Sequence, residues 1–411
     1  MMNNECSIRT QPFHKNVSFM LFIYWAVLVV WQNIGGAEAR SSIDIVIKVG
    51  LLLYFISFFF LRIKTLSKNI VYFVLLIFPF LLTFFGEKQI NFNIIISYFF
   101  PIVFIFCVYC IGNNFTVTKK HLTAFCKCVI LVDVCSAVYA LIFCQDQFVS
   151  ALTVSNAYGN ELTSFFISSH EYGMYLVYGI ASCLICLYYN KGGKIRKKIP
   201  YLLAILLFAP NLILTFSRTS IFAFLILLII YILFSKSKAL KFAAALSVVG
   251  VAVLIWQVPI LNNFVFKIVL KDNNMAGRNV LMELALKYFR DGTIIEKHFG
   301  HGIMASRGFF VDKTEHGSVH NAYLQILLYF GAIMLVALLI FLFTQCIACI
   351  KEMKVNRFMG AIHLGIVASA AAMMFTNTSI LFMSPIDSFF LTMYAIVIPK
   401  YVRNAIKRDC F

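Results

Sequence analysis

Long apolar stretches separated by short polar segments run through the whole chain. An apolar run of about 20 residues is the length of helix that crosses the ~30 Å hydrocarbon core of a membrane. Lipid offers no partners to backbone groups, so such runs form helices, whereas a β-barrel shows short alternating segments. The predicted spans are 17–34, 43–61, 69–86, 91–111, 122–143, 172–189, 199–216, 219–235, 242–260, 322–346, 358–376 and 384–399. This pattern predicts an all-α, polytopic membrane protein with about 12 transmembrane helices.

Composition agrees with the pattern. Hydrophobic residues make up 61% of the 411 residues, and only 13% are charged, where a soluble protein has roughly a quarter. Phe alone contributes 44 residues. A water-soluble fold of this size could not bury so much apolar surface.

The positions of the basic residues predict the orientation. Seven segments that fall on one side of the predicted membrane hold 22 of the 35 Lys and Arg residues, and the short loops on the other side hold only Arg40, Lys88 and Arg218. Lys and Arg concentrate on the cytoplasmic side of membrane proteins. Both termini are therefore predicted to be cytoplasmic. Much of the net charge of +18 follows from topology, which argues against nucleic acid as a partner.

We predict one transmembrane domain over 1–411, with a large extracytoplasmic loop at 261–318. Within this loop, residues 279–290 have apolar positions at helical spacing beside charged positions. This spacing predicts an amphipathic helix lying at the outer membrane interface.

Three pairs of cysteines have CxxC spacing, at 107/110, 183/186 and 346/349. Such spacing occurs in metal and redox sites. All three pairs fall in apolar runs or at their ends, and no second ligand pair accompanies them in a polar loop. They are interpreted as small residues packed inside helices.

A polar turn interrupts the apolar stretch between two predicted spans. It reads TFSRTS from Thr215 to Ser220 and puts Arg218 on the outer side, against the general charge bias. One interpretation is an arginine that reaches to lipid phosphates. The other is an arginine held for an anionic ligand, because the planar guanidinium fork matches phosphate.

Two further candidates lie at the ends of the large loop. Arg278 precedes the predicted interfacial helix, where free amide groups attract an anion; a solvated loop arginine is the alternative. His320 lies where the loop enters an apolar helix. Imidazole exchanges protons near neutral pH and suits a general base, while a helix cap or a lipid-headgroup contact is the alternative.

More polar residues gather on the outer side. His170 and Glu171 lie where the other long outer loop, 144–171, enters a span, and His301 lies between two glycines. His170 and Glu171 suit the binding of sugar hydroxyls, and an interfacial cap explains them equally well. No HExxH motif occurs, and we predict no metal and no cofactor.

Taken together, three motifs resemble the superfamily of O-antigen polymerases (Wzy type) and O-antigen ligases (WaaL type). These motifs are the SRT turn at 217–219, Gly277-Arg278 early in the large loop, and His320-Asn321 before a span. Nine residues separate Asn321 from Gly331, as in the family's HN-x9-G pattern. Met334 stands where the family usually has Gly, Thr or Tyr. The resemblance is best over 199–345.

The resemblance implies a membrane glycosyltransferase of the GT-C type that uses undecaprenyl-diphosphate-linked sugars without a metal. Arg218 and Arg278 would bind the diphosphate and stabilise its charge as it leaves, and His320 would orient or deprotonate the attacking hydroxyl. The predicted substrate-binding residues are Ser217, Thr219, Asn321, Tyr323, His170, Glu171 and His301.

The leading hypothesis is polymerisation of lipid-linked repeat units into O-antigen or capsular polysaccharide on the periplasmic face of the bacterial inner membrane. Its expected partners are the lipid-linked oligosaccharide, membrane lipids and a chain-length regulator. The first alternative is ligation of finished polymer to lipid A-core. The second is a lipid-linked sugar flippase, which would place ionisable residues near the midplane; Lys48, Lys127 and Asp133 are the main charges within the predicted spans.

Overall fold

The structure is a computed structural model, and it describes six stretches of the chain together with isolated positions. The described residues are 119–153, 161–166, 168–190, 194–235, 275–314 and 319–375, with 81, 83, 84, 87, 95, 98, 238, 241, 242, 246 and 257. All regular secondary structure in this part of the chain is helical.

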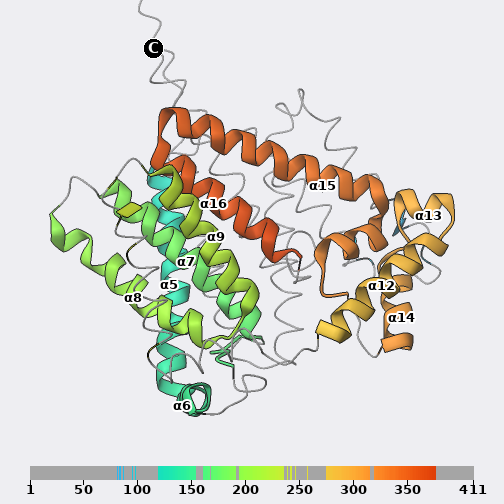
Figure 1. The fold of residues 1–411 in the computed structure, drawn as a ribbon, viewed down its shortest axis with the longest axis horizontal. Coiled ribbons are helices and arrows are strands. Elements are labelled where there is room, and N and C mark those ends of the chain that lie inside the picture. The colour runs from blue at the N-terminus through green and yellow to red at the C-terminus, as the bar shows by residue number, and fades with distance from the viewer. Residues whose placement is uncertain are drawn as a thin grey trace, which may run out of the picture.

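Six apolar helices build the main body (Figure 1). They are α5 (Lys119–Phe143), α7 (Ser169–Tyr189), α8 (Ile199–Leu214), α9 (Arg218–Phe234), α15 (Ala322–Val355) and α16 (Arg357–Met373). Three of them, α5, α7 and α15, are long and apolar enough to cross a membrane, and α8, α9 and α16 are shorter apolar helices. The sequence therefore predicted helices correctly at all six of these positions.

The other six predicted spans fall outside the described residues, apart from isolated positions. They are 17–34, 43–61, 69–86, 91–111, 242–260 and 384–399. The total of 12 spans and the GT-C-like architecture stay predictions.

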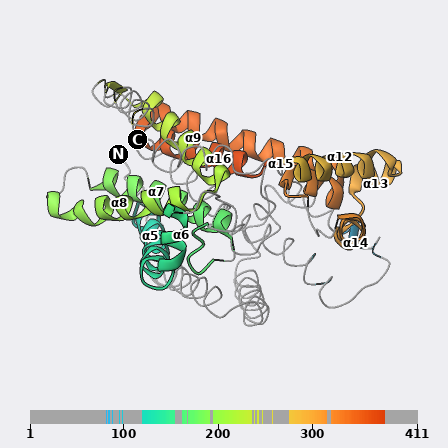
Figure 2. The ribbon, with the colours of Figure 1, turned by 60° about the horizontal axis from the view of Figure 1, so that its bottom comes forward.

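The six helices form two layers, which Figure 2 separates. Helices α9, α16 and α15 lie side by side in one layer, and α5, α7 and α8 form the other. Helix α7 joins them, because it packs on α5 and α8 and also on α9 and α16. Of the most apolar 18 residues of α7, 78% are buried, against 50% for α5 and 44% for α15. Helix α7 is thus the core of the bundle, whereas no more than half of the corresponding residues of α5 and α15 are buried.

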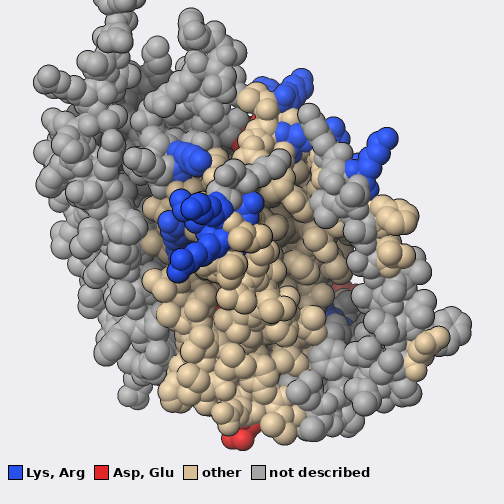
Figure 3. Space-filling model, turned by 90° about the vertical axis from the view of Figure 1, so that its left-hand side faces the viewer, with Lys and Arg blue, Asp and Glu red and all other residues tan. Residues whose placement is uncertain are grey.

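One end of the bundle is basic. Helices α5, α8 and α16 begin there and α7, α9 and α15 end there, so the charged residues at these termini come together. Figure 3 shows Lys and Arg gathered on the upper part of one face. The exposed basic residues at these helix ends are Lys119, Lys194, Arg196, Lys197, Lys351, Lys354 and Arg357. We call this the basic end. The charge argument predicted that these positions share one side of the membrane.

Aromatic rings close the basic end. Tyr188 of α7 stacks on Phe358 of α16 with ring centroids 4.5 Å apart, and Tyr231 of α9 meets the same ring edge-on at 5.1 Å. Asn356 caps α16 and donates from Nδ2 to the Tyr188 hydroxyl at 2.9 Å. These contacts join the two layers directly beneath the basic residues.

Helix α15 departs from the prediction in two ways. It runs to Val355, although the span was predicted to end at 346 and 347–357 to be a loop. Hydropathy marks only the apolar part of a helix, while Lys, Glu and Met are good helix formers that continue it. The helix also breaks at Gly331, where φ is 78°. A nine-residue arm, 322–330, therefore precedes the long apolar arm.

Three helices from the large loop pack beside this short arm. They are α12 (Met275–Asp291), α13 (Ile294–Phe299) and α14 (Ile303–Thr314). Helix α12 contains the amphipathic helix predicted at 279–290. Protein covers only part of its apolar surface: Leu281 and Ala285 are buried and the helix packs on α15 and α13, whereas Val280 and Leu286 are exposed.

The described cysteine pairs lie within helices, as the sequence predicted. Cys183 and Cys186 are buried in α7, and Cys349 is buried in α15 while Cys346 is half-buried. Within the described stretches, no three or more His, Cys, Asp or Glu residues are grouped so that they could hold a metal ion.

Candidate active site at the end opposite the basic residues

The SRT motif forms a tight turn between α8 and α9. Thr215 ends α8, and Ser217 caps α9 by accepting a hydrogen bond from the Ser220 amide. Between them Phe216 has a φ of 47° and its side chain is 1% exposed. A left-handed backbone is strained in a bulky residue, so the burial of this ring holds the turn in place. Arg218 is the first residue of α9.

The N-terminus of α7 packs against this turn. Nδ1 of His170 lies 2.8 Å from Oγ of Ser217, and Oγ of Ser220 donates to the His170 carbonyl at 3.3 Å. A Cβ added to Gly173 would come within 2.7 Å of the Ser220 side chain, so only glycine allows this approach. The structure thus joins two separately predicted candidates, the SRT turn and His170, in one cluster.

The hydrogen bonds of the cluster define which side chains are committed to the fold. Ser217 is 0% exposed, and its hydroxyl contacts both His170 and Ser220. The amide of Glu171 donates to Ser168, which caps α7. Ser217 therefore holds the turn together, and the predicted substrate roles of Glu171 and Thr219 stay predictions.

The HN motif forms a second strained turn. His320 is exposed with a φ of 52°, and Asn321 directly after it caps α15 by accepting from the Leu324 amide at 3.1 Å. The Ala322 amide donates to the carbonyl of Met374 at the end of α16, at 2.8 Å. The Tyr323 hydroxyl donates to the Ala371 carbonyl at 2.8 Å, which fixes its ring beside the turn.

Helix α16 brings the two turns to the same end of the bundle. It runs antiparallel to α9: Gly365 lies against Leu227, and Ser369 one turn later donates to the Ala223 carbonyl at 2.6 Å. The same register leads on toward the start of α9 and to Met374, which holds the HN turn. We call this the motif end; it lies opposite the basic end.

The glycines of the large loop allow it to dock on the break in α15. Gly300, Gly302 and Gly331 all have positive φ. The amides of His301 and Gly302 donate to the carbonyls of Leu328 and Tyr329, at 2.7 and 3.2 Å. A helix break leaves carbonyls without helical partners, and here the loop amides donate to these carbonyls. This docking gives Gly331 of the HN-x9-G pattern a physical role.

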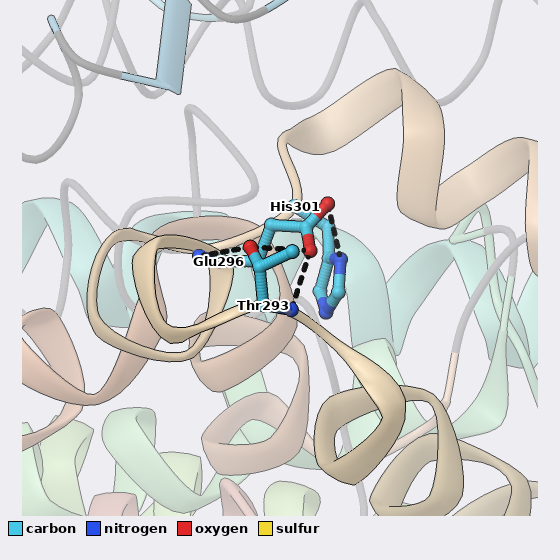
Figure 4. A network of polar contacts seen from close by, with 3 residues as sticks. All are labelled: Thr293, Glu296 and His301. Carbon is cyan, nitrogen blue, oxygen red and sulfur yellow. Dashed lines mark hydrogen bonds and ion pairs between the residues drawn. The ribbon is translucent and has the colours of Figure 1, made fainter.

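His301 lies inside the loop (Figure 4). Its ring stacks on Tyr288 at 4.2 Å, its Nδ1 is 3.6 Å from Glu296, and its side chain is 4% exposed. Burial lowers the pKa of His301, opposed by the nearby Glu296. The amide and hydroxyl of Thr293 both donate to Glu296 and lower its pKa. His301 supports the loop, and its predicted substrate role stays a prediction.

Arg278 lies in the first turn of α12, as predicted for an arginine at the start of the loop helix. The described packing of α12 is made by later residues. Tyr288 stacks on Phe309 at 4.0 Å and on His301, and Ala285 is fully buried.

Two polar networks were not predicted from the sequence. Helix α14 is capped from far away: the Ile303 amide donates to the Tyr98 hydroxyl at 2.8 Å, and Tyr98 donates to Glu87 at 2.7 Å. The only sequence signal was Glu87 itself, in a short loop predicted to be on the outer side. Tyr329 in α15 accepts from both Gln325 and Arg307, at 2.7 and 3.4 Å.

These features define a helical membrane protein with arginine and histidine motifs at one end of its bundle. The family model of O-antigen ligases matches residues 202–342. This region runs from α8 into α15 and includes the SRT turn, Arg278, the docked loop and the HN turn. The predicted resemblance to the O-antigen polymerase and ligase superfamily is confirmed there. No curated protein matches the chain.

Proposed function

We propose that this protein polymerises undecaprenyl-diphosphate-linked oligosaccharide repeat units on the outer face of the bacterial inner membrane. The observation that carries the proposal is that the SRT turn, joined to the start of α7, and the HN turn lie at the same end of the bundle, opposite the basic residues. By the positive-inside rule the basic end faces the cytoplasm. The motif end is then at the outer headgroup level, where the diphosphate of a lipid-linked glycan lies.

The proposed reaction transfers a glycan from one lipid carrier to another. A hydroxyl oxygen of the acceptor sugar attacks the anomeric carbon of the donor, and the bond from that carbon to the diphosphate breaks. His320 orients this hydroxyl and accepts its proton. Arg218 and Arg278 bind the diphosphate and stabilise the negative charge that it carries away.

The neighbouring polar residues bind the sugars in this proposal. Asn321 and Tyr323 follow His320 on the short arm of α15, and the Tyr323 ring offers a face for a sugar. Thr219 lies beside Arg218, and His170 and Glu171 approach from α7. A chain-length regulator and the surrounding lipids are the expected partners.

Ligation of finished polymer to lipid A-core is the second candidate. The matched family model carries the description O-antigen ligase, and both reactions need a bound diphosphate and an activated hydroxyl. A flippase is the third candidate. Asp133 of α5 is 0% exposed within the apolar part of the bundle, and buried acids inside membranes mark transport paths in many proteins.

A gel of surface glycolipids from a deletion strain tests all three. The strain is complemented with wild type, R218A, R278A or H320A, and with R357A as a control at the basic end. Polymerase function predicts chains of one repeat unit on the lipid core. R218A, R278A and H320A should each lose more than ~100-fold of the polymer, and R357A should restore it.

The other outcomes contradict the proposal in distinct ways. Bare lipid core with long polymer left on the undecaprenyl carrier identifies a ligase. Repeat units that never reach the outer face identify a transporter, and the assigned site is then wrong.

A further inference from the structure

Two adjacent isoleucines at the start of α13 are among the most exposed large apolar side chains that the structure describes. Ile294 is 77% exposed and Ile295 is 72% exposed. An isolated exposed apolar residue is common on protein surfaces, but large neighbours form a patch, and such patches mark contacts with another molecule or a membrane. We call Ile294 and Ile295 the isoleucine pair.

The polar groups of α13 are directed toward the protein. Thr293 and Glu296 bond to one another in a capping box, and Glu296 lies 3.6 Å from Nδ1 of His301. Each helical residue turns the chain by ~100°, so the middle of the isoleucine pair points ~150° away from Glu296. The side of α13 that faces away from the loop is therefore its apolar side.

Helix α13 lies where the long apolar arm of α15 begins, as Figures 1 and 2 both show. The carbonyl of His298 lies against Gly331 at the break. Ile294 is one turn before His298, whose Nδ1 is 2.8 Å from the Ile294 carbonyl. Directly after the break, the long arm exposes a stripe of apolar residues at helical spacing, 40% to 66% exposed: Ile333, Val336, Ile340 and Phe343. The isoleucine pair and this stripe thus begin within one turn of the same contact.

The length of the long arm gives the depth of this contact in the membrane. Residues 332–350 include no charged residue, and Lys351 follows them at the basic end. At ~1.5 Å per residue they extend for about 28 Å, which matches the ~30 Å of the hydrocarbon core. With Lys351 at the inner edge of the core, Gly331 and the isoleucine pair lie at the outer edge.

Helix α12 offers no comparable surface. Its exposed apolar residues Val280 and Leu286 are ~120° apart around the helix, and the exposed residues Glu283 and Lys287 lie in the arc between them. A charged residue in that arc opposes entry into lipid. The continuous apolar surface of the loop at this level is therefore on α13.

We infer that the isoleucine pair enters the outer leaflet of the membrane, at the boundary between headgroups and acyl chains, and holds the large loop at that level. The occupant of the patch is lipid, because the patch continues the stripe by which α15 faces lipid. The inference does not depend on which transfer reaction the protein performs.

The reactivity of introduced cysteines tests this contact. The full chain carrying I294C, I295C or V311C is reconstituted in phosphatidylcholine vesicles and treated with a membrane-impermeant maleimide, with wild type as the background. V311C is the control, because Val311 is 51% exposed on the face of α14 that also exposes Arg307. The thiolate is the reactive form, so both cysteines at the isoleucine pair should react at least ~10-fold more slowly than V311C.

Brominated acyl chains supply a positive signal for lipid. The emission that I295W adds to the wild-type spectrum should fall by about half or more in vesicles of brominated phosphatidylcholine, because an interfacial residue reaches the acyl chains. The emission added by V311W should be nearly unchanged.

Three results would overturn the inference. The first is reaction of I294C and I295C as fast as V311C in the vesicles. The second is slow reaction without quenching of I295W, which means that the protein itself covers the pair. The third is slow reaction in spheroplasts of the host but not in the vesicles, which identifies another protein as the occupant.

Discussion

The two ends of the helical bundle are built on different principles. At the basic end, stacked rings and relaxed helix termini hold the layers together, and the charges above them are exposed to solvent. At the motif end, Phe216 and His320 both adopt left-handed backbone conformations just before a helix cap. Such strain persists only where the surroundings impose it, and it clusters at functional sites. We propose that the first end anchors the protein and that the second carries its chemistry.

The largest effect is expected from a substitution that breaks the docking of the large loop on the Gly331 break in α15. In G331A the new Cβ would lie 2.2 Å from the His298 carbonyl oxygen, at a φ of 78°. Neither backbone can move without undoing the loop, so we expect no detectable polymer on the glycolipid gel. The control is G308A, because a Cβ there meets nothing within 4 Å. Normal chain length in G331A, at normal protein level in the membrane, would contradict the role given to this contact.

A large effect on stability without a matching effect on chemistry is expected at the basic end. His363 of α16 and Glu352 of α15 form a pair with Nδ1 and Oε2 2.5 Å apart and side chains 0% and 2% exposed. Removing one partner leaves the other buried without its partner, at a cost of about 3–5 kcal/mol. Denaturant titration of H363A in detergent should show this loss. The surviving folded protein should keep its KM; a changed KM would mean that the basic end also contributes to the site.

Two asparagine caps, one at each end, allow a matched comparison, and the expected effects of substituting them are intermediate in size. Asn356 caps α16 at the basic end and Asn321 caps α15 at the motif end. Each substitution to alanine should lower the free energy of unfolding by about 1 kcal/mol. N321A should in addition lower polymer formation about tenfold, because it loosens the turn that holds His320. Equal activity of N321A and N356A would show that the difference between the ends is not functional.

The smallest effect is a pH dependence of the docked loop. Burial lowers the pKa of His301 below its ordinary value of 6.5, so on acidification the unfolded loop binds this proton first. The stabilisation is complete above about pH 6.5 and is lost as the pH falls below it. Glu296 acts at lower pH. Its pKa lies below 4.5, so the stability that it gives the folded loop is lost only as the pH falls below that value.

Hydrogen exchange of residues 293–303 at pH 7.5 and 5.5 measures this effect. Protection should be lower at pH 5.5 once the intrinsic exchange rates are corrected. In H301Q the difference should vanish, because glutamine does not titrate. A loop in the wild type that is equally protected at both values would show that His301 does not couple protonation to docking.

Local sequence signals predicted the helices well because each depends on its own residues. The run of apolar residues located α5, α7, α8 and α9 within three residues at each end. The charge of helix ends also predicted which termini share a side. The end of α15 was missed because a helix continues past the apolar run whose length hydropathy measures.

The site was predicted only in part because its contacts are made between distant segments. The sequence identified His170 and Ser217 as separate candidates, 47 positions apart. No periodicity shows that Gly173 lets α7 approach the turn closely enough to join them. The caps from Glu87 and Tyr98 on α14, more than 200 positions away, were missed for the same reason.

The break at Gly331 also sets an angular constraint. Each residue of the short arm turns the chain by ~100° about the helix axis and advances it by ~1.5 Å. Inserting or deleting a single residue between Asn321 and Gly331 would rotate the HN turn by ~100° relative to the docked loop, whatever residue it was. The number of residues between Asn321 and Gly331 thus constrains the geometry of the site more tightly than the identity of those residues does.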